Sequence, residues 1–405
     1  MMEKAQKKTP NLRFKGFTDD WEQRKLGKVI VDYKKKNNND RLPVLTSSFQ
    51  GIEYQEKHFG SKQKHDTSDY NVLPKGYMTY RNRSDNGYFK FNINKLGVTG
   101  IVSKFYPVFT TIDTNKQFLA SYMNYNYRLK NHFKVVSVGT SQHVLSLRNL
   151  KKTDLLLPSK SEQDQIGEFF NLLNKRIDLQ QRKLDLLKQL KKGLLQKMFA
   201  AEKNSKQPAL RFKGFHDDWE QHKLGDALEE FSYGLNTPAT KFDGKNKYLR
   251  ITDIDDDTHA FNQISLTSPK DKDDNYILGQ GDILFARTGA SVGKTYMYKA
   301  NDGKVYYAGF LIKGHIKNGF STEFIFNTTR LPQYQNFVKV TSMRSGQPGI
   351  NAKEYQNYVI YVPVKQEQER IGQLISKLDT LITLHQQKLN KLNNLKQGLL
   401  QQMFI

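Results

Sequence analysis

The stretch TGASVGKT, Thr288 to Thr295, carries two glycines, a lysine and a threonine in nearly the order that phosphate-binding loops use. Such a loop requires G-x-x-x-x-G-K-[ST], in which backbone amides and the lysine hold the phosphates of a nucleotide. Here position 288 is threonine, Gly289 comes one residue too late, and no matching acidic strand for the metal ion is evident. The sequence therefore predicts a glycine-rich turn whose amides and Lys294 contact a phosphate of DNA, rather than a nucleotide site.

The acidic run TDIDDDTH, Thr252 to His259, is a second candidate, in this case for calcium. A calcium loop needs glycine at its sixth position and glutamate at its twelfth, and the chain has Thr258 and Ile264 there. The run is predicted to be a solvated loop.

Signals for catalysis are otherwise missing. The sequence has no H-x-x-x-H pair, no nucleophile elbow, no N-P-P-Y of adenine methyltransferases and no P-D start of the common nuclease motif. This pattern favours a binding subunit over an enzyme.

Basic residues mixed with amides and aromatics remain, in the segments YRNRSDNGY, FGSKQKH and GTSQH of the first half and ARTGASVGK and MRSGQPG of the second. Arginine can read guanine, Asn or Gln can read adenine, and lysines and hydroxyls can hold phosphates. Ordinary surface positions are the alternative for each residue. The predicted DNA-contacting residues are the lysines of FGSKQKH on either side of Gln63, which are Lys62 and Lys64, then Tyr80, Arg81, Asn82, Arg83, Ser84 and Gln142, and Arg287, Thr288, Lys294, Arg344, Ser345 and Gln347.

The composition agrees with a polyanionic partner. The 405 residues suggest two to four domains, and 64 Lys+Arg against 40 Asp+Glu give a formal charge of +24. Nucleic acid is the first expectation and an anionic membrane surface is the rival. The absence of cysteine fits a reducing compartment. With no apolar stretch like a signal peptide and no run of ~18 apolar residues, a soluble cytoplasmic protein without membrane contact is expected.

A long internal repeat organises the chain. LRFKGFTDDWEQRKLG, Leu12 to Gly27, returns as LRFKGFHDDWEQHKLG, Leu210 to Gly225, at a shift of 198. LLLPSKSEQDQIGEFF and KGLLQKMF return as IYVPVKQEQERIGQLI and QGLLQQMF at a shift of 205. The middles have diverged, and only LPKGYMTYRNR and LGQGDILFART still correspond, each predicting a glycine turn into a short apolar strand that ends in arginine. The middles are predicted to be mixed, with more strand than helix, and Trp21 and Trp219 to be core anchors.

From Glu162 and Glu367 two proline-free segments of 38 residues run to Phe199 and Phe404. Each carries a 4-3 seam in which eight of ten positions are apolar, and the polar exceptions match, Gln180 with His385 and Lys191 with Lys396. Helices of this length, about 57 Å at 1.5 Å per residue, predict an intramolecular coiled coil, although each helix could instead lie on its own domain. The predicted interface residues are Ile166, Phe170, Leu173, Ile177, Leu184 and Leu187, and Ile371, Ile375, Leu378, Ile382, Leu389 and Leu392.

These features resemble one family over nearly the full length: the FKGF-x-DDWE opening twice, the P-x-x-x-EQ-x-x-IG helix entry twice, the G-x-x-x-LLQ-x-M close twice, and GDILFARTGASVGKT. The chain resembles the specificity (S) subunit of type I restriction-modification enzymes, with openings like those of staphylococcal and other Firmicute members. The resemblance implies an α+β chain with two target recognition domains, each reading one half of a split double-stranded DNA target, and two conserved spacer helices. It also implies a subunit without an active site or cofactor of its own.

The partners implied by the resemblance are two modification subunits, which use S-adenosylmethionine to methylate adenine, and restriction subunits, which use ATP and magnesium. The expected arrangement is an antiparallel helix pair with an internal pseudo-twofold, matching the dyad of DNA and acting as a ruler. The expected boundaries are 1–158 and 209–363 for the recognition domains, 159–200 and 364–405 for the helices, and 201–208 for the linker. The alternatives are a coiled-coil scaffold with basic lobes that bind nucleic acid non-specifically, and an enzyme acting alone.

Overall fold

The computed structural model of the chain describes residues 8–38, 41–61, 66–199, 206–256, 258–343 and 347–404. The chain divides into two compact units, unit 1 with residues 1–181 and 387–405 and unit 2 with residues 182–386. Each unit therefore contains one lobe, together with parts of both long helices. No helix within the described ranges is long and apolar enough to cross a membrane.

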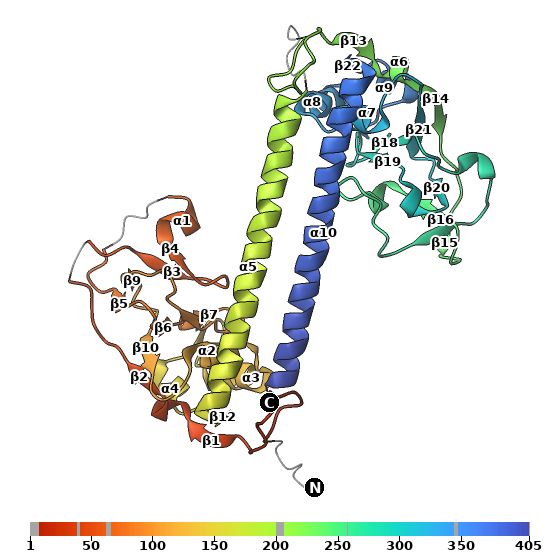
Figure 1. Cartoon of the computed structure of the whole chain (residues 1–405). Helices are drawn as coiled ribbons and strands as arrows, with labels where there is room; N and C mark the ends of the chain where they lie inside the picture. Colours follow the sequence, from red (N-terminus) through yellow and green to blue (C-terminus); the bar gives the residue numbers. More distant parts are fainter. Residues whose placement is uncertain are drawn as a thin grey trace. The chain divides into compact units, whose positions relative to one another are not determined.

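Unit 1 holds the first lobe, coloured red to yellow in Figure 1. Its elements are β1 (Glu22–Lys25), β2 (Ile30–Asp32), β3 (Leu45–Ser47), β4 (Ile52–Tyr54), α1 (Gln55–Phe59), β5 (Asn71–Leu73), β6 (Met78–Thr79), β7 (Arg83–Ser84), β8 (Asn92–Ile93), β9 (Gly100–Val102), β10 (Val108–Thr111), α2 (Lys116–Tyr125), α3 (Tyr127–Val136), β11 (His143–Val144), α4 (Leu147–Lys151) and β12 (Asp154–Leu157). The long helix α5 (Lys160–Lys197) follows.

Unit 2 holds the second lobe, coloured green to blue in Figure 1. Its elements are β13 (Glu220–Lys223), α6 (Leu224–Ala227), β14 (Leu228–Tyr233), β15 (Ala239–Lys241), β16 (Lys247–Leu249), β17 (Thr267–Pro269), β18 (Asp282–Ala286), β19 (Thr295–Met297), β20 (Val305–Tyr307), β21 (Leu311–Ile316), α7 (Thr322–Thr328), α8 (Pro332–Thr341), α9 (Ala352–Gln356) and β22 (Val359–Val362). The long helix α10 (Lys365–Met403) is the last of these elements along the chain. Single 3₁₀ turns lie at Leu26–Lys28, Ile251–Asp253, Asp274–Tyr276 and Ala300–Asp302.

The two lobes share one sheet plan. Unit 1 has an antiparallel sheet in the order β2-β10-β6-β8, and unit 2 has one in the order β14-β21-β18-β19. The corresponding stretches of the diverged middles supply β6 and β18, each after a glycine with positive φ, 77° at Gly76 and 98° at Gly281. The predicted glycine turn and short strand are therefore present in both halves.

In each unit the start of one long helix packs with the end of the other, so the pair is antiparallel. The core of unit 1 joins Ile166 and Phe170 of α5 to Leu400 and Met403 of α10, and the core of unit 2 joins Met198, which directly follows α5, to Ile371 of α10. The predicted interface positions are all buried or half-buried: Ile166, Phe170, Leu173, Leu184, Ile371, Ile375, Leu378, Ile382 and Leu389 are buried, and Ile177, Leu187 and Leu392 are half-buried. The predicted antiparallel packing is confirmed.

The helix ends are also part of the lobe cores. Phe404 packs against Phe118, with ring centroids 5.9 Å apart, and Phe118 packs against Trp21 at 5.9 Å. In unit 2 the counterparts Phe199, Phe324 and Trp219 form the same group, at 5.0 and 5.5 Å. Each lobe is therefore completed by the helix end of the other half, and both tryptophans are core anchors, each 2% exposed.

The copied opening segment is tied to the helices by duplicated polar contacts. Arg13 donates two hydrogen bonds to the carboxylate of Glu162, at 2.9 and 2.7 Å, and Arg211 does the same to Glu367 at the same two distances. The Leu12 amide donates to the carbonyl of Gln402 at 3.0 Å, and the Leu210 amide to that of Lys197 at 2.8 Å. The glutamate of the EQ-x-x-IG motif thus anchors the opening segment of its own half.

The other motif residues hold the lobe against the helix. Gln163 accepts from the Asn115 amide at 3.1 Å, and Gln368 accepts from the Ser321 amide at 2.9 Å. A Cβ at Gly167 would lie 2.4 Å from Asn115 Oδ1, so only glycine permits this approach. We name these duplicated contacts, with the aromatic groups above, the frame.

The matched polar seam positions serve each unit differently. Gln180 is buried on α5. Lys191 of α5 forms an ion pair with Asp379 of α10, and Asp379 also accepts from Arg330 of the lobe at 2.8 Å. Lys396 instead lies over the ring of Tyr125, 5.4 Å from its centroid. A buried ion pair has strict geometric needs, so the Lys191–Asp379 pair helps to fix the register of the two helices.

Candidate nucleic-acid interface

In unit 1, strand pairing brings two of the predicted reading segments together. β7 pairs with β11, placing Arg83 opposite Val144 and Ser84 opposite His143. The Gln142 amide donates to Asp85 Oδ1 at 3.3 Å, which ties the two segments side chain to side chain. Segments about 60 residues apart in the sequence therefore form one edge, as reading loops on a rigid support would.

The arginines of this edge face outward. Arg81 and Arg83 are exposed, and the Arg83 guanidinium lies 4.0 Å from the centroid of the Phe105 ring. Stacking on an aromatic face orients a guanidinium while leaving its edge donors for a ligand. Ser84 is buried and donates to Asn86 Oδ1 at 2.9 Å. Both arginines are thus placed for base or phosphate contact.

Tyr80 and Asn82 alternate with these arginines and point the other way. Tyr80 is fully buried and its hydroxyl donates to the Leu145 carbonyl at 2.8 Å, while burial raises its pKa far above the ordinary value. This corrects the assignment of Tyr80 to a DNA-contacting surface: it supports the loop from inside. Asn82 is half-buried, its amide and carbonyl bond Phe105 and Leu145, and its Oδ1 is buried without a partner among the described residues.

A hollow of about 440 Å³ lies beside Arg81 and Arg83. The β3–β4 turn closes one side of it and presents Phe49, which is 73% exposed. Sequence reasoning missed Phe49, since an isolated phenylalanine in a strand-turn pattern predicts a core residue. Aromatic side chains at such a surface can stack on bases or apolar groups.

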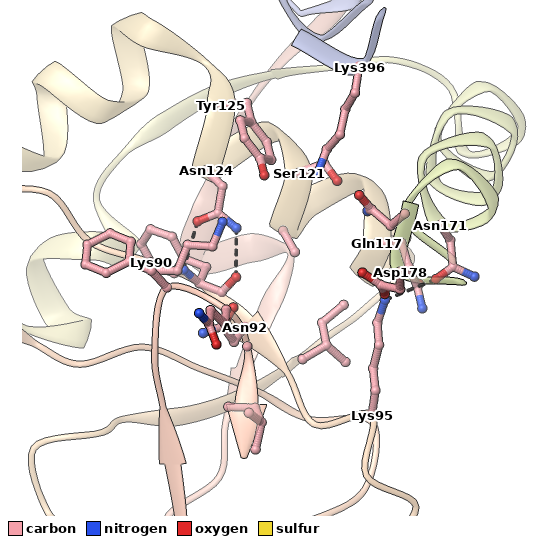
Figure 2. Close-up of a pocket in the computed structure, with 18 residues that line it drawn as sticks. Lys90, Asn92, Lys95, Gln117, Ser121, Asn124, Tyr125, Asn171, Asp178 and Lys396 are labelled. Carbon is pink, nitrogen blue, oxygen red and sulfur yellow. Dashed lines mark hydrogen bonds between the residues drawn. The ribbon is translucent and has the colours of Figure 1, made fainter. Parts of the chain in front are cut away.

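Figure 2 shows a second hollow, of about 360 Å³. It adjoins the first, and the two share Phe49 and Lys90. Its floor is set by Asn124, which accepts from the Phe91 amide at 2.9 Å and donates to the Phe91 carbonyl at 2.8 Å. Lys95 donates to Asn171 of α5 at 3.0 Å. The hollow thus extends from the arginines to the helix pair within unit 1.

Tyr125 lies between two lysines in this second hollow. The ammonium groups of Lys90 and Lys396 are 4.9 and 5.4 Å from the ring centroid. Burial raises the pKa of Tyr125, but the two positive charges outweigh burial and the net shift is downward. Burial also lowers the pKa of Lys95. The hollow is therefore positive, as a phosphate contact requires, although neither Lys90 nor Lys396 belongs to a recognisable motif.

Unit 2 brings its own reading segments together in the same way. Thr288 bridges to Gly349, the Gly289 amide donates to the Pro348 carbonyl at 3.0 Å, and the Ile350 amide donates to the Arg287 carbonyl at 2.9 Å. Thr288 is half-buried, and Gln347 is exposed beside Gly289. The half-buried Arg287 lies over Tyr233, 4.7 Å from the ring centroid.

In the TGASVGKT segment, the lysine and several of the amides already have partners within the protein. The amides of Val292, Gly293 and Lys294 donate to carbonyls within or next to the turn, at 3.1, 2.9 and 3.1 Å. The Lys294 ammonium donates to the Ile254 carbonyl at 3.1 Å and pairs with Asp256, and its side chain is only 13% exposed. This corrects the expectation that Lys294 contacts DNA: it ties the turn to the loop before it.

Some of the predicted contact residues lie outside the described residues. They are Lys62 and Lys64, on either side of Gln63, together with Arg344 and Ser345. No group of three or more His, Cys, Asp or Glu side chains suited to a metal ion occurs in the mapped ranges.

Comparison with known proteins places both halves in one group. The sequence profile described as type I restriction modification DNA specificity domain matches residues 18–189 and again residues 216–394. The putative type I restriction enzyme MjaX specificity subunit of Methanocaldococcus jannaschii is 25% identical over 194 residues, 46% of each chain. The type I restriction enzyme EcoKI specificity subunit of Escherichia coli K12 is 23% identical over 287 residues, 68% of this chain and 62% of that protein. The matches thus span about half to three-fifths of these relatives' lengths.

A solved structure shares the fold across the whole chain. The crystal structure of the type I restriction-modification system S subunit from M. genitalium aligns with a TM-score of 0.68 at 15% identity, covering 98% of this chain and 99% of the other.

Proposed function

The chain belongs to the family of type I restriction modification DNA specificity domains, of which it holds two copies, and we propose that it is the DNA-reading subunit of a type I restriction-modification complex. Each lobe reads one half of a split target through the segments that its loops bring together. The observation that carries the proposal is the duplication of the frame. The same contacts occur in both halves, and they support two lobes whose reading edges differ.

The chemistry of the edges fits base reading. Arg83 in unit 1 and Arg287 in unit 2 lie over aromatic rings, and Arg81 is exposed near Arg83. An arginine can donate two parallel hydrogen bonds and is the commonest reader of guanine. The positive hollow around Lys90, Lys95 and Lys396 suits the phosphates that flank a half-site. We assign no catalytic step to this chain.

We propose that the outer faces of the long helices dock modification subunits. On α5, Leu172, Leu179 and Leu186 recur every seven residues and are 56, 65 and 64% exposed. Exposed leucines at heptad spacing suit a second apolar seam with a partner helix. In this proposal two modification subunits bring S-adenosylmethionine, and restriction subunits bring ATP and magnesium ions.

The test is to co-express the chain with its modification subunit in a methylation-free host and to map methylated adenines across the genome. The expected result is a split motif methylated on opposite strands of its two halves. A stable complex that binds target and scrambled duplexes equally and methylates no motif would contradict the proposal and favour a non-specific scaffold.

A further inference from the structure

A pocket of about 700 Å³ lies in unit 2, where the end of α5 and the start of α10 meet the second lobe. Cavities of roughly 300–1,000 Å³ hold small organic ligands. Four cations, Lys188, Lys191, Lys192 and Arg330, line this pocket with one carboxylate, Asp379. We name it the junction pocket.

The two inner cations are built into the protein. The side chains of Arg330 and Lys191 are 6 and 10% exposed, and each binds a different oxygen of Asp379. One carboxylate therefore faces two buried cations, with Lys188 and Lys192 exposed at the rim. Burial and the charge of Arg330 lower the pKa of Lys191 to about 8 in spite of Asp379. The junction pocket thus carries excess positive charge, which a bound anion would compensate.

The remaining lining adds apolar surface and a hydrogen-bond acceptor. Leu195, Pro332 and Ile382 supply apolar surface. His259 has a left-handed backbone, φ 57°, and its Nδ1 lies 2.8 Å from the Thr295 carbonyl. Because a carbonyl only accepts, Nδ1 carries the proton, and burial lowers the pKa of the ring to about 4. Nε2 is therefore a neutral acceptor, suited to an amino group.

The cation cluster is not a requirement of the frame. At the repeat shift of 205, Asn393 and Gln397 stand in place of Lys188 and Lys192, and Asn174 stands in place of Asp379. Only Lys191 has a cationic counterpart, Lys396. Since the first half builds the same frame with Asn393 and Gln397 at these positions, the frame does not account for the positive charge of Lys188 and Lys192.

We propose that the junction pocket binds the phosphate of a nucleotide, with phosphoryl oxygens at Arg330, Lys188 and Lys192 and the base against the apolar wall. A free nucleoside phosphate and a nucleotide of bound DNA present the same chemistry. Binding of a DNA nucleotide rests on the proposed function, whereas binding of a free nucleoside phosphate does not.

The first experiment titrates ATP and inorganic tripolyphosphate into the whole chain by calorimetry. We expect ATP to bind more tightly than tripolyphosphate, and the rim variant Lys188→Gln/Lys192→Gln to lose about tenfold in ATP affinity. The control Lys377→Gln/Lys388→Gln removes the same charge from exposed sites of α10 outside the pocket and should leave affinity unchanged. Arg330→Gln/Asp379→Asn, which preserves net charge, should also lose binding while keeping the far-ultraviolet circular dichroism spectrum.

The second experiment measures target and scrambled duplexes on the assembled methylation complex at several salt concentrations. If the phosphate comes from DNA, free ATP does not bind, the rim variant weakens both duplexes by the same factor, and its salt slope falls by roughly one to two. The proposal is overturned if the rim variant and the control agree in both experiments. Failure of the proposed function is separate, because it appears as equal affinity of the unaltered complex for target and scrambled duplexes.

Discussion

At the scale of single residues, the carboxylate of Glu162 is 1% exposed and accepts both of its strong hydrogen bonds from Arg13. Removing one partner of a buried pair leaves a desolvated charge, which costs about 3–5 kcal/mol. Glu162→Gln should lower the free energy of unfolding by about 2–4 kcal/mol in chemical denaturation. Glu22→Gln breaks the exposed Arg24 pair and should cost less than about 1 kcal/mol; equal losses would contradict the anchoring role.

Arg83 is the matched test of base reading. Its guanidinium is exposed and stacked on Phe105, so Arg83→Gln removes a bidentate donor without disturbing the core. We expect a loss of about 1–3 kcal/mol in affinity for the target and relaxed methylation at one position of one half. Arg24→Gln, on the exposed strand β1, should change neither the affinity nor the methylated sequence. Uniform weakening on all sequences would make Arg83 a phosphate contact instead.

His259 gives unit 2 a pH dependence. Its folded pKa, about 4, is lower than its ordinary value of 6.5, so between these values the unfolded chain binds more protons and stability rises with pH. Stability should therefore fall by on the order of 2 kcal/mol as pH drops from about 6.5 to 4. His259→Gln should lessen that fall, whereas the exposed His216→Gln should not. Denaturation curves at several pH values check this, and unchanged slopes would refute it.

Residue types alone predicted the arginine edge but not which neighbours would face it. In YRNR the side chains alternate, so that Tyr80 is buried and Arg81 and Arg83 are exposed. The sequence around YRNR does not show which of the two alternating sets of side chains faces the core. Lys294 forms an ion pair with Asp256, which lies 38 residues earlier in the sequence. Only the tertiary structure reveals this pairing.

At the scale of elements, the heptad seams predicted the helix pair because periodicity is a local property. Continued from Leu392 and Lys396, the 4-3 spacing predicts that Leu399 is the next interface residue, but in the last turn Leu400 is buried and Leu399 is only half-buried. There the helix end enters a lobe core with Phe404, so its buried face is wider than a coiled-coil seam. Sequence periodicity cannot show where one kind of packing gives way to the other.

The helix pair also yields a length prediction. Deleting residues 179–185 from α5 alone shifts its end by about 10 Å relative to α10, which breaks the frame contacts. We expect loss of methylation. Deleting 179–185 together with 384–390, which match at the 205 shift, should restore methylation with a target gap shorter by about three base pairs. Genome-wide mapping of methylated adenines measures the target gap of both variants. An unchanged gap in the paired deletion would contradict the prediction that helix length sets the gap.

At the scale of the whole molecule, the frame separates what must stay constant from what may vary. Exchanging residues 30–150 for those of a relative leaves Arg13, Trp21, Glu162 and the helices in place, and the relative must supply its own counterparts of Asn115 and Phe118. The expected outcome is a new sequence in one half of the methylated motif and the old sequence in the other. Changes in both halves would show that the lobes do not read independently.

The contribution of each helix end to the opposite half has a consequence for synthesis on the ribosome. Unit 2 is one continuous run, residues 182–386, whereas unit 1 needs Met403 and Phe404 to fill its core. At roughly 5–20 residues per second, the first lobe waits about 10–45 s until Met403 and Phe404 have been synthesised. The usual order, in which the first-made domain matures first, is therefore reversed, and the nascent first lobe is the species that chaperones would meet.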